Sequence, residues 1–160
     1  MSKTLLIIGA GGHGHVVAET ALACGYIPSF LDDNNQEAVG TISQLEQLAP
    51  QYDAVFVAIG NNEKRRELLD RVEKPITLIH PAAYISPSAT IGAGSIVLPG
   101  AIVHTGVRIG KGCIISIGAL VDHNAVVGDY CHINAGAICK SGSKVESLKK
   151  IESGNVVQGY

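Results

Sequence analysis

The stretch LVDHNAVVGDYCH, residues 120–132, holds two of the six histidines in the chain, His123 and His132. Histidine has an ordinary pKa near neutral pH, so it can take a proton from an attacking nucleophile or, as neutral imidazole, bind a metal. Asp122 directly precedes His123, where a carboxylate could support such a base. A solvated corner histidine without a chemical role is a third interpretation. The choice among them depends on the elements that carry these side chains.

A second chemically suggestive group is the turn GAGGHG, residues 9–14. It matches G-x-G-x-x-G, follows the apolar run TLLIIG and precedes the helix-compatible stretch HVVAETALACG. A turn between a strand and a helix can offer backbone N–H groups and the positive helix end to a phosphate. Asp32 and Asp33 follow the next apolar run about 20 residues later, where a carboxylate commonly binds a ribose. These residues predict a site for a mononucleotide or nucleotide sugar.

Residues 1–80 alternate short apolar runs with polar stretches that suit helices. The later runs are IPSFLDD, DAVFVAIG and ITLIH, and the polar stretch NNEKRRELLDRVEK lies between the last two. Strands alternating with helices predict a small parallel α/β sheet, here a Rossmann-like half domain. The pattern changes near His80-Pro81, so we expect domains at 1–80 and 81–160.

The second domain repeats with a period of six. Every sixth residue from Ile85 to Val157 is Ile or Val, except Cys139, and we call these thirteen positions anchors. Three residues after many anchors stands a glycine, as at Gly94 and Gly100, which suits a corner that needs positive φ. The pattern resembles the hexapeptide-repeat left-handed parallel β-helix, an all-β fold with three repeats to a coil of about 18 residues. Residues 18 apart should therefore stack along the coil axis.

The residue before each anchor lies on a strand and should point outward. Two of the three outward columns are apolar. One contains Ile102, Leu120 and Ile138. The other contains Ile96 and Ile114 and ends in His132 and Lys150. Two apolar faces and one polar face on a three-sided prism predict a homotrimer. His123, at the corner after Leu120, would then lie where two subunits meet.

Composition excludes several classes of partner. The net charge of −2 gives no basic surface for nucleic acid, and no apolar run approaches the ~18 residues of a membrane span. The glycines at residues 9–14 end the first apolar run too early for a signal peptide, so we expect a cytoplasmic protein. The four cysteines show no CxxC pairing, and Cys113 and Cys131, one coil apart, are expected to be small core residues.

Five motifs occur in one order: GAGGHG, the Asp32-Asp33 pair, AIGNN at 58–62, HPAAYISPSATIG and VDHNAVVGDYCHINAGA. Over nearly the whole chain this combination resembles the hexapeptide-repeat family of nucleotide-sugar and sialic-acid acetyltransferases. The resemblance implies acetyl-CoA as co-substrate, a nucleotide-linked amino sugar as acceptor in glycan biosynthesis, a trimer, and no metal. The leading expectation is N-acetylation of a UDP-4-amino sugar.

Three other functions remain open at this point. The acceptor could be a sugar hydroxyl, as for sialic acid, and spacing does not separate O- from N-acetylation. The protein could be a trimer that binds a nucleotide sugar without catalysis. A zinc hydratase is the third option, because His104, His123 and His132 supply suitable residue types.

The resemblance also assigns residues. It puts His123 on the general base, with Asp122 and Asn124 beside it. It puts the acceptor site on the first turn, the acidic pair and the turn after the third apolar run: Gly11, Gly12, His13, Asp32, Asp33, Gly60 and Asn61. It puts His132 on the second histidine of the family motif. Separately from the resemblance, the clustered Lys149 and Lys150 either meet the CoA phosphates as point charges or form a solvated basic end of the coil. With Ser141 and Gly142, these residues make up the expected acetyl-CoA site.

The chain departs from the family pattern in two places. The residue after the base is usually acidic, but here it is Asn124. Either Asp122 takes over its role, or the base is weakened, or activity is lost. The chain also stops about one coil earlier than many members, which leaves part of the acetyl-CoA groove unassigned.

Overall fold

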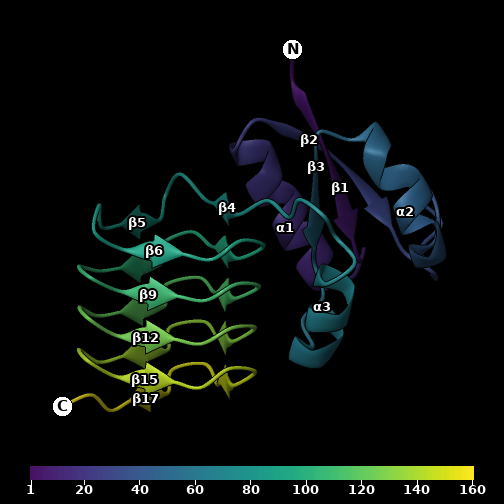
Figure 1. The fold of residues 1–160 in the computed structure, drawn as a ribbon. Helices are drawn as coiled ribbons and strands as arrows, with labels where there is room; N and C mark the ends of the chain where they lie inside the picture. The colour runs from purple at the N-terminus through teal and green to yellow at the C-terminus, as the bar shows by residue number, and fades with distance from the viewer. The chain divides into compact units, whose positions relative to one another are not determined.

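The computed structural model describes all 160 residues, which fold into two compact units, Met1–Ile76 and Thr77–Tyr160 (Figure 1). The first unit is an α/β domain and the second is a parallel β-helix. The sequence placed the boundary at His80-Pro81, and it assigned the run ITLIH to the α/β sheet. In the structure, the N–H of Ile76 still donates to Val55, but the N–H of Leu78 donates to Ser95 of the β-helix. The residues of an apolar run do not indicate which sheet the run joins. The sequence therefore did not show that the β-helix begins within ITLIH.

The α/β unit contains one parallel sheet of three strands in the order β2-β1-β3. Its elements are β1 (Lys3–Ile8), α1 (Gly12–Ala23), β2 (Tyr26–Leu31), η1 (Ile42–Gln44), α2 (Leu45–Leu48), η2 (Ala49–Gln51), β3 (Ala54–Val57) and α3 (Asn62–Leu69). The short helices between β2 and β3 were not expected. The central strand β1 is fully buried over Leu5, Leu6, Ile7 and Ile8, as a near-continuous apolar run in a parallel sheet predicts. None of the helices is long and apolar enough to cross a membrane.

The β-helix is built from two-residue strands stacked in three parallel sheets. The first sheet contains β4 (Leu78–Ile79), β7 (Ile96–Val97), β10 (Ile114–Ile115), β13 (His132–Ile133) and β16 (Lys150–Ile151). The second contains β5 (Tyr84–Ile85), β8 (Ile102–Val103), β11 (Leu120–Val121), β14 (Ile138–Cys139) and β17 (Val156–Val157). The third contains β6 (Thr90–Ile91), β9 (Arg108–Ile109), β12 (Val126–Val127) and β15 (Lys144–Val145).

The hexad register predicted from the sequence is confirmed. Each strand from β5 to β17 ends on an anchor, and partners in each sheet are 18 residues apart, as in the pair Val121 and Cys139. The anchors and the small residues beside them form one continuous core along the coil axis. Each of the three sides of the prism points one anchor inward in every coil. Because almost all anchors are Ile or Val, branched side chains fill the interior.

The corners repeat as regularly as the strands. Every sixth residue from Gly94 to Gly154 has positive φ, and eight of these eleven positions are glycine. Asn124, with φ of 59°, takes the place that glycine fills at most of these corners. Tyr130 and Leu148 also adopt this conformation, with φ of 56° and 66°, which the sequence did not predict. A left-handed backbone costs such residues roughly 1–2 kcal/mol each.

The cysteines of the core have a second role besides filling space. Cys113 and Cys131 are buried free thiols, as expected, and each Sγ donates at 3.0 Å to a corner carbonyl, of Gly128 and Glu146 respectively. Thr77 and Ser95, in the same column of the coil, donate to Gly92 and Gly110 through their hydroxyls. In successive coils, a small side chain from this column therefore donates a hydrogen bond to the backbone carbonyl at the same corner.

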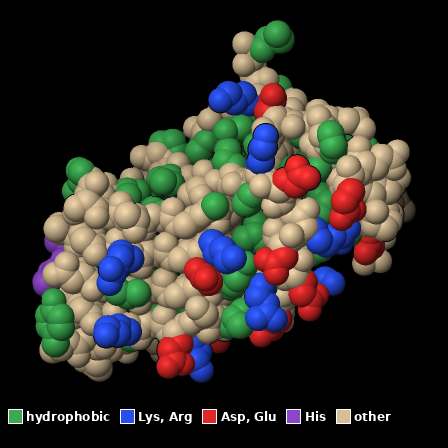
Figure 2. All heavy atoms as spheres, viewed as in Figure 1, with side chains coloured by type: hydrophobic (Ala, Val, Ile, Leu, Met, Phe, Trp, Pro, Cys, Tyr) green, Lys and Arg blue, Asp and Glu red, His purple; other side chains and the backbone are tan.

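The outward columns differ from the expectation in one respect. Ile102 and Leu120 are exposed by 40% and 36%, so the second sheet does present an open apolar face. The other expected apolar face is not open, because Ile96 and Ile114 are 0% and 1% exposed in a single copy of the chain. Figure 2 shows acidic and basic side chains gathered mainly over the N-terminal unit, with fewer over the β-helix.

Candidate active site

The carboxyl ends of the three parallel strands place the predicted acceptor residues at one edge of the α/β sheet. Gly9, with φ of 104°, directly follows β1, and its N–H donates at 2.8 Å to the carbonyl of Leu31 at the end of β2. A Cβ on Gly9 would lie 2.8 Å from the carbonyl oxygen of Ala58, which follows β3. The first turn thus packs against the ends of both neighbouring strands. The exposed Gly11 and Gly12 follow it and begin α1, whose first N–H groups have no partner within the helix.

Asp32 holds the first turn in place. Its carboxylate accepts the N–H of Ala10 at 2.8 Å and that of Asn34 at 2.8 Å. The hydrogen bond from Ala10 and then that from Asn34 keep the pKa of Asp32 below its usual value. Asp33 has a different contact, because it accepts the N–H of Ile42 at the start of η1. The structure therefore brings Asp32 to the turn around Gly11–His13 and ties Asp33 to the next segment.

The turn after β3 completes this edge. Gly60 is exposed, and Asn61 caps α3 by accepting the N–H of Lys64 at 2.9 Å. Beneath the turn lies Arg65, which is only 1% exposed and donates to the carbonyl oxygens of Ile59 and Gly60. Sequence analysis missed Arg65. The available signal was its place three and four residues before Leu68 and Leu69, on the buried side of α3.

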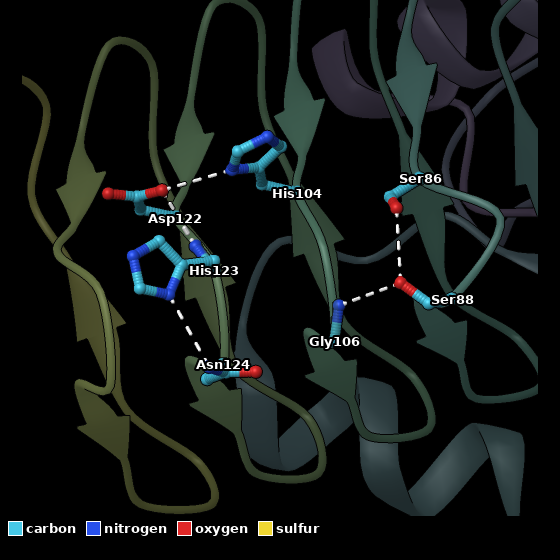
Figure 3. Close-up of polar contacts among 7 residues, drawn as sticks. All are labelled: Ser86, Ser88, His104, Gly106, Asp122, His123 and Asn124. Atoms are coloured by element: carbon cyan, nitrogen blue, oxygen red, sulfur yellow. Dashed lines mark hydrogen bonds and ion pairs between the residues drawn. The ribbon is translucent and has the colours of Figure 1, made fainter.

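The predicted base stands on a corner of the β-helix between β11 and β12. Figure 3 shows His104, Asp122, His123 and Asn124 around this corner. The carboxylate of Asp122 lies 3.1 Å from Nδ1 of His104, one coil away, and accepts the N–H of His123 at 2.7 Å. The rings of His104 and His123 are 6.4 Å apart between centroids. His104 and Asp122 are 18 residues apart, so the predicted stacking of coils brings them together.

Asp122 acts on the main chain of His123, and no hydrogen bond joins its carboxylate to the imidazole. The N–H of His123, followed by the side chain of His104, keeps the pKa of Asp122 below its usual value. These contacts favour the ionised carboxylate, so they persist above the ordinary carboxyl pKa and weaken as the pH falls toward the lowered one. Asp122 fixes the corner from which His123 extends.

Asn124 is the side chain that approaches the imidazole. Its Nδ2 lies 3.4 Å from Nδ1 of His123, and its Oδ1 lies against Gly106, where a Cβ would overlap it. Gly106 is itself held by the preceding coil, because its N–H donates to the hydroxyl of Ser88 at 3.0 Å (Figure 3). An amide can present either its NH₂ or its carbonyl to the ring, whereas a carboxylate can only accept. Asn124 can therefore bind either neutral tautomer of His123.

Of the residues expected to bind acetyl-CoA, two lie beside the base and three do not. Ser141 and Gly142 form the corner one coil beyond His123, and the N–H of Gly142 donates to the His123 carbonyl at 3.0 Å. His132 and Lys150 lie on the first sheet, which is the side of the prism opposite the His123 corner. Lys149 directly precedes the strand β16, which begins at Lys150. Lys150 pairs there with Glu152 at 3.5 Å.

Two other features of the chain do not form part of this site. No group of three His, Cys, Asp or Glu side chains could hold a metal ion, so His104, His123 and His132 do not converge in a single copy. A hollow of about 380 Å³ in the α/β unit is lined by residues between Leu45 and Lys74 that include Tyr52, Asp53 and Arg71. None of the predicted site residues lines it, because it lies by the start of β3.

The chain joins a three-stranded α/β unit, which has a glycine-rich strand-to-helix turn, to a hexapeptide β-helix with a corner histidine. This combination is typical of one class of acyltransferase-like proteins. Residues 4–72 match the model of the PglD N-terminal domain. The chain is 34% identical over 113 residues to UDP-N-acetylbacillosamine N-acetyltransferase of Bacillus subtilis (strain 168), covering 60% of this chain and 51% of the relative. The chain thus spans about half the length of this curated relative.

Two solved structures resemble the chain over almost its entire length. The acetyltransferase domain of PglB from Neisseria gonorrhoeae FA1090, in complex with acetyl coenzyme A, is 36% identical with a TM-score of 0.94, covering 99% of this chain and 83% of that one. A mutant of perosamine N-acetyltransferase from Caulobacter crescentus, in complex with CoA and GDP-perosamine, is 30% identical with a TM-score of 0.85, covering 98% and 89%. The chain belongs to the PglD-like family of hexapeptide-repeat acetyltransferases.

Proposed function

We propose that this chain transfers the acetyl group of acetyl-CoA to the amino group of a nucleotide-linked amino sugar, with His123 as general base. The observation that carries the proposal is the corner that holds His123 between Asp122 and Asn124, on a fold shared with domains solved with acetyl-CoA or with CoA and GDP-perosamine. The relatives' names support the amino group as acceptor over a sugar hydroxyl. A cytoplasmic location is part of the proposal.

His123 supplies the proton acceptor that this reaction needs. The acceptor nitrogen attacks the thioester carbonyl carbon, the C–N bond forms, the C–S bond breaks and CoA leaves as the thiol. The nitrogen loses a proton as the bond forms, and an imidazole takes it, typically for a factor of about 10²–10⁴ in rate. The imidazolium then gives this proton to the departing sulfur, so that CoA leaves as the thiol and the base is restored. When the carbonyl of Asn124 faces Nδ1, the ring carries its proton there and Nε2 is free to act as the base.

The α/β unit supplies the binding site for the nucleotide sugar. Gly11, Gly12 and His13 offer the start of α1 to the phosphates, and Asp32 holds that turn through Ala10. Gly60 and Asn61 add the start of α3 at the same edge of the sheet. All three segments follow parallel strands, and ligands of open α/β sheets commonly bind beyond the carboxyl ends of such strands.

A homotrimer completes the acetyl-CoA site in this proposal. The open apolar face of the second sheet, with Ile102 and Leu120 exposed, is the surface that a second copy would cover. His132, Lys149 and Lys150 lie away from the His123 corner of their own chain, so they reach acetyl-CoA only from a neighbouring subunit. Ser141 and Gly142, one coil from His123, serve the same ligand from within the chain. Sedimentation showing only monomer at micromolar concentration would overturn the trimer.

The activity is tested by measuring thiol release from acetyl-CoA with a panel of acceptors. The panel contains UDP-linked 4-amino sugars, GDP-perosamine, and the matching sugars with a hydroxyl in place of the amine. We expect release only with an amino acceptor, and mass spectrometry of the product should place the acetyl group on that nitrogen. Release with the hydroxyl sugars would show O-acetylation, and acceptor binding without any release would show a non-catalytic protein.

A further inference from the structure

Arg65 is a buried cation in the α/β unit, and none of the residue roles proposed so far includes it. It lies in the first turns of α3 and is 1% exposed, beside the buried Leu68 and Leu69 of the same helix. Removing an ion from water costs several kcal/mol unless hydrogen bonds compensate for the loss. A leucine or methionine would fill the position without that cost, so packing alone does not account for an arginine here.

Three hydrogen bonds join Arg65 to the turn between β3 and α3 and to the first residue of α3. Nη1 donates to the carbonyl oxygens of Ile59 at 2.9 Å and of Gly60 at 3.1 Å, and Nη2 donates to Oδ1 of Asn62 at 2.6 Å. The planar guanidinium has several donors in a fixed fork, so it can hold three oxygens at once, which a lysine ammonium does less well. The turn is thereby fixed from beneath, while Asn61 fixes it from the helix end.

The direction of these hydrogen bonds decides where the turn points its donors. In a trans peptide the C=O and the following N–H lie in one plane and point in opposite directions. With the carbonyls of Ile59 and Gly60 directed at Arg65, the N–H groups of Gly60 and Asn61 point away from the guanidinium. Gly60 and Asn61 are both exposed, so these N–H groups face the outer side of the turn.

We infer that Arg65 is a positioning residue for the nucleotide part of the acceptor: it holds residues 59–62 so that the N–H groups of Gly60 and Asn61 face the ligand. Its positive charge directly beneath the turn also favours an anion there. The inference rests on the proposed function, because it assumes that a phosphate-bearing acceptor binds at this edge. It predicts that Arg65 affects binding of the nucleotide sugar and leaves acetyl-CoA binding unchanged.

The test compares Arg65→Met and Arg65→Lys with Arg66→Met. Arg66 is the adjacent arginine, is partly exposed and pairs with Glu63 at 2.8 Å, so its loss removes the same charge without touching the turn. For each folded protein we would measure KM for acetyl-CoA, KM for the best UDP- or GDP-linked amino sugar of the panel, and binding of that sugar nucleotide by calorimetry. We expect KM and Kd for the sugar nucleotide to rise about tenfold or more in Arg65→Met and less in Arg65→Lys, as loss of hydrogen bonds from a charged group implies. KM for acetyl-CoA should stay within about twofold, and Arg66→Met should match the wild type.

Each other outcome has a definite meaning. If the wild type binds no sugar nucleotide, the proposed function fails and the inference fails with it. If the wild type binds one and the Arg65 variants bind it equally well, or if both KM values rise together, only the inference is overturned. Should Arg65→Met not fold, Arg65→Lys decides, because a lysine retains the charge and lacks the fork.

Discussion

The two units of this chain place their candidate functional residues in opposite ways. In the β-helix one corner geometry is repeated eleven times between Gly94 and Gly154, and Asn124, directly after His123, takes the corner position that is glycine in eight of these eleven cases. In the α/β unit each of the three turns occurs once, and each is held by its own contacts, such as those of Asp32 and Arg65. In the repeat, the candidate base lies beside a departure from the pattern. In the α/β unit, the candidate binding residues lie where strands end.

The largest effect should come from the interior of the repeat. Ile115 is fully buried, whereas Ile117, two residues later on the same coil, is 53% exposed. Replacing a buried isoleucine with alanine typically costs about 2–5 kcal/mol through lost burial and the cavity left behind. We expect Ile115→Ala to lower the free energy of unfolding by that amount, and Ile117→Ala to leave it nearly unchanged. Denaturant titration of both variants measures this, and equal losses would contradict the assigned register.

A smaller effect should come from the corner backbone. A Cβ added to Gly118 would meet nothing within 4 Å, but its φ is 62°, so Gly118→Ala isolates the conformational cost. We expect that variant to lose roughly 1–2 kcal/mol of stability, and Gly118→Asn to lose less, since asparagine tolerates this conformation better. Thermal unfolding of the two variants provides the comparison. If asparagine cost as much as alanine, conformation would not explain why Asn124 can replace a corner glycine.

A rate effect should follow from changing the residue beside the base. Asn124→Asp puts a carboxylate next to the imidazole, where it would stabilise the charged ring and hold the tautomer with Nε2 free. We expect kcat to rise about threefold to tenfold, since one pKa unit corresponds to about 1.4 kcal/mol. Asn124→Gly keeps the backbone conformation and removes the side chain, so it serves as the control and should lower kcat. An unchanged kcat in both variants would show that residue 124 does not act on His123.

Chemical labelling should distinguish the cysteine of the α/β unit from the three cysteines of the β-helix. This prediction concerns reactivity and involves no change in stability. Cys24, at the end of α1, is partly exposed, whereas Cys113, Cys131 and Cys139 are buried. Burial, with a further contribution from Cys131, raises the pKa of Cys139 to about 11, which removes its thiolate at ordinary pH. We expect iodoacetamide at pH 8 to modify Cys24 alone in the native protein and all four after denaturation. Mass mapping after digestion reads this out, and native labelling of Cys139 would contradict the closed core.

The sequence predicted most of the β-helix because its signal is repeated. The hexad fixed the strands, the stacking and the corner of Asn124, since thirteen anchors in register leave little freedom. It did not reveal that Ile96 and Ile114 are buried in a single copy, because an outward position says nothing of what covers it. Tyr130 and Leu148 were missed since side-chain preference disfavours their backbone conformation.

The candidate site was predictable to the extent that it lies at strand ends and corners. The glycine turn, Asp32 and His123 follow from such positions, while the contacts among them do not. The sequence could not show that Asp122 binds the main chain of His123, that Asp33 turns to Ile42, or that Arg65 lies under the turn at Gly60. These depend on rotamers and on which backbone groups lack partners, which spacing does not encode.

The most direct test of the account is the turnover number of His123→Ala with both substrates shown to be bound. Calorimetry should first confirm that acetyl-CoA and the sugar nucleotide bind the variant as they bind the wild type. Thiol release at saturating concentrations of both is then measured, with His80→Ala, another β-helix histidine outside the candidate site, as control. The account predicts a loss of about 10²–10⁴ in kcat for His123→Ala alone, as removal of a general base implies. A variant that binds both substrates and keeps kcat within threefold of wild type would show that His123 is not the base.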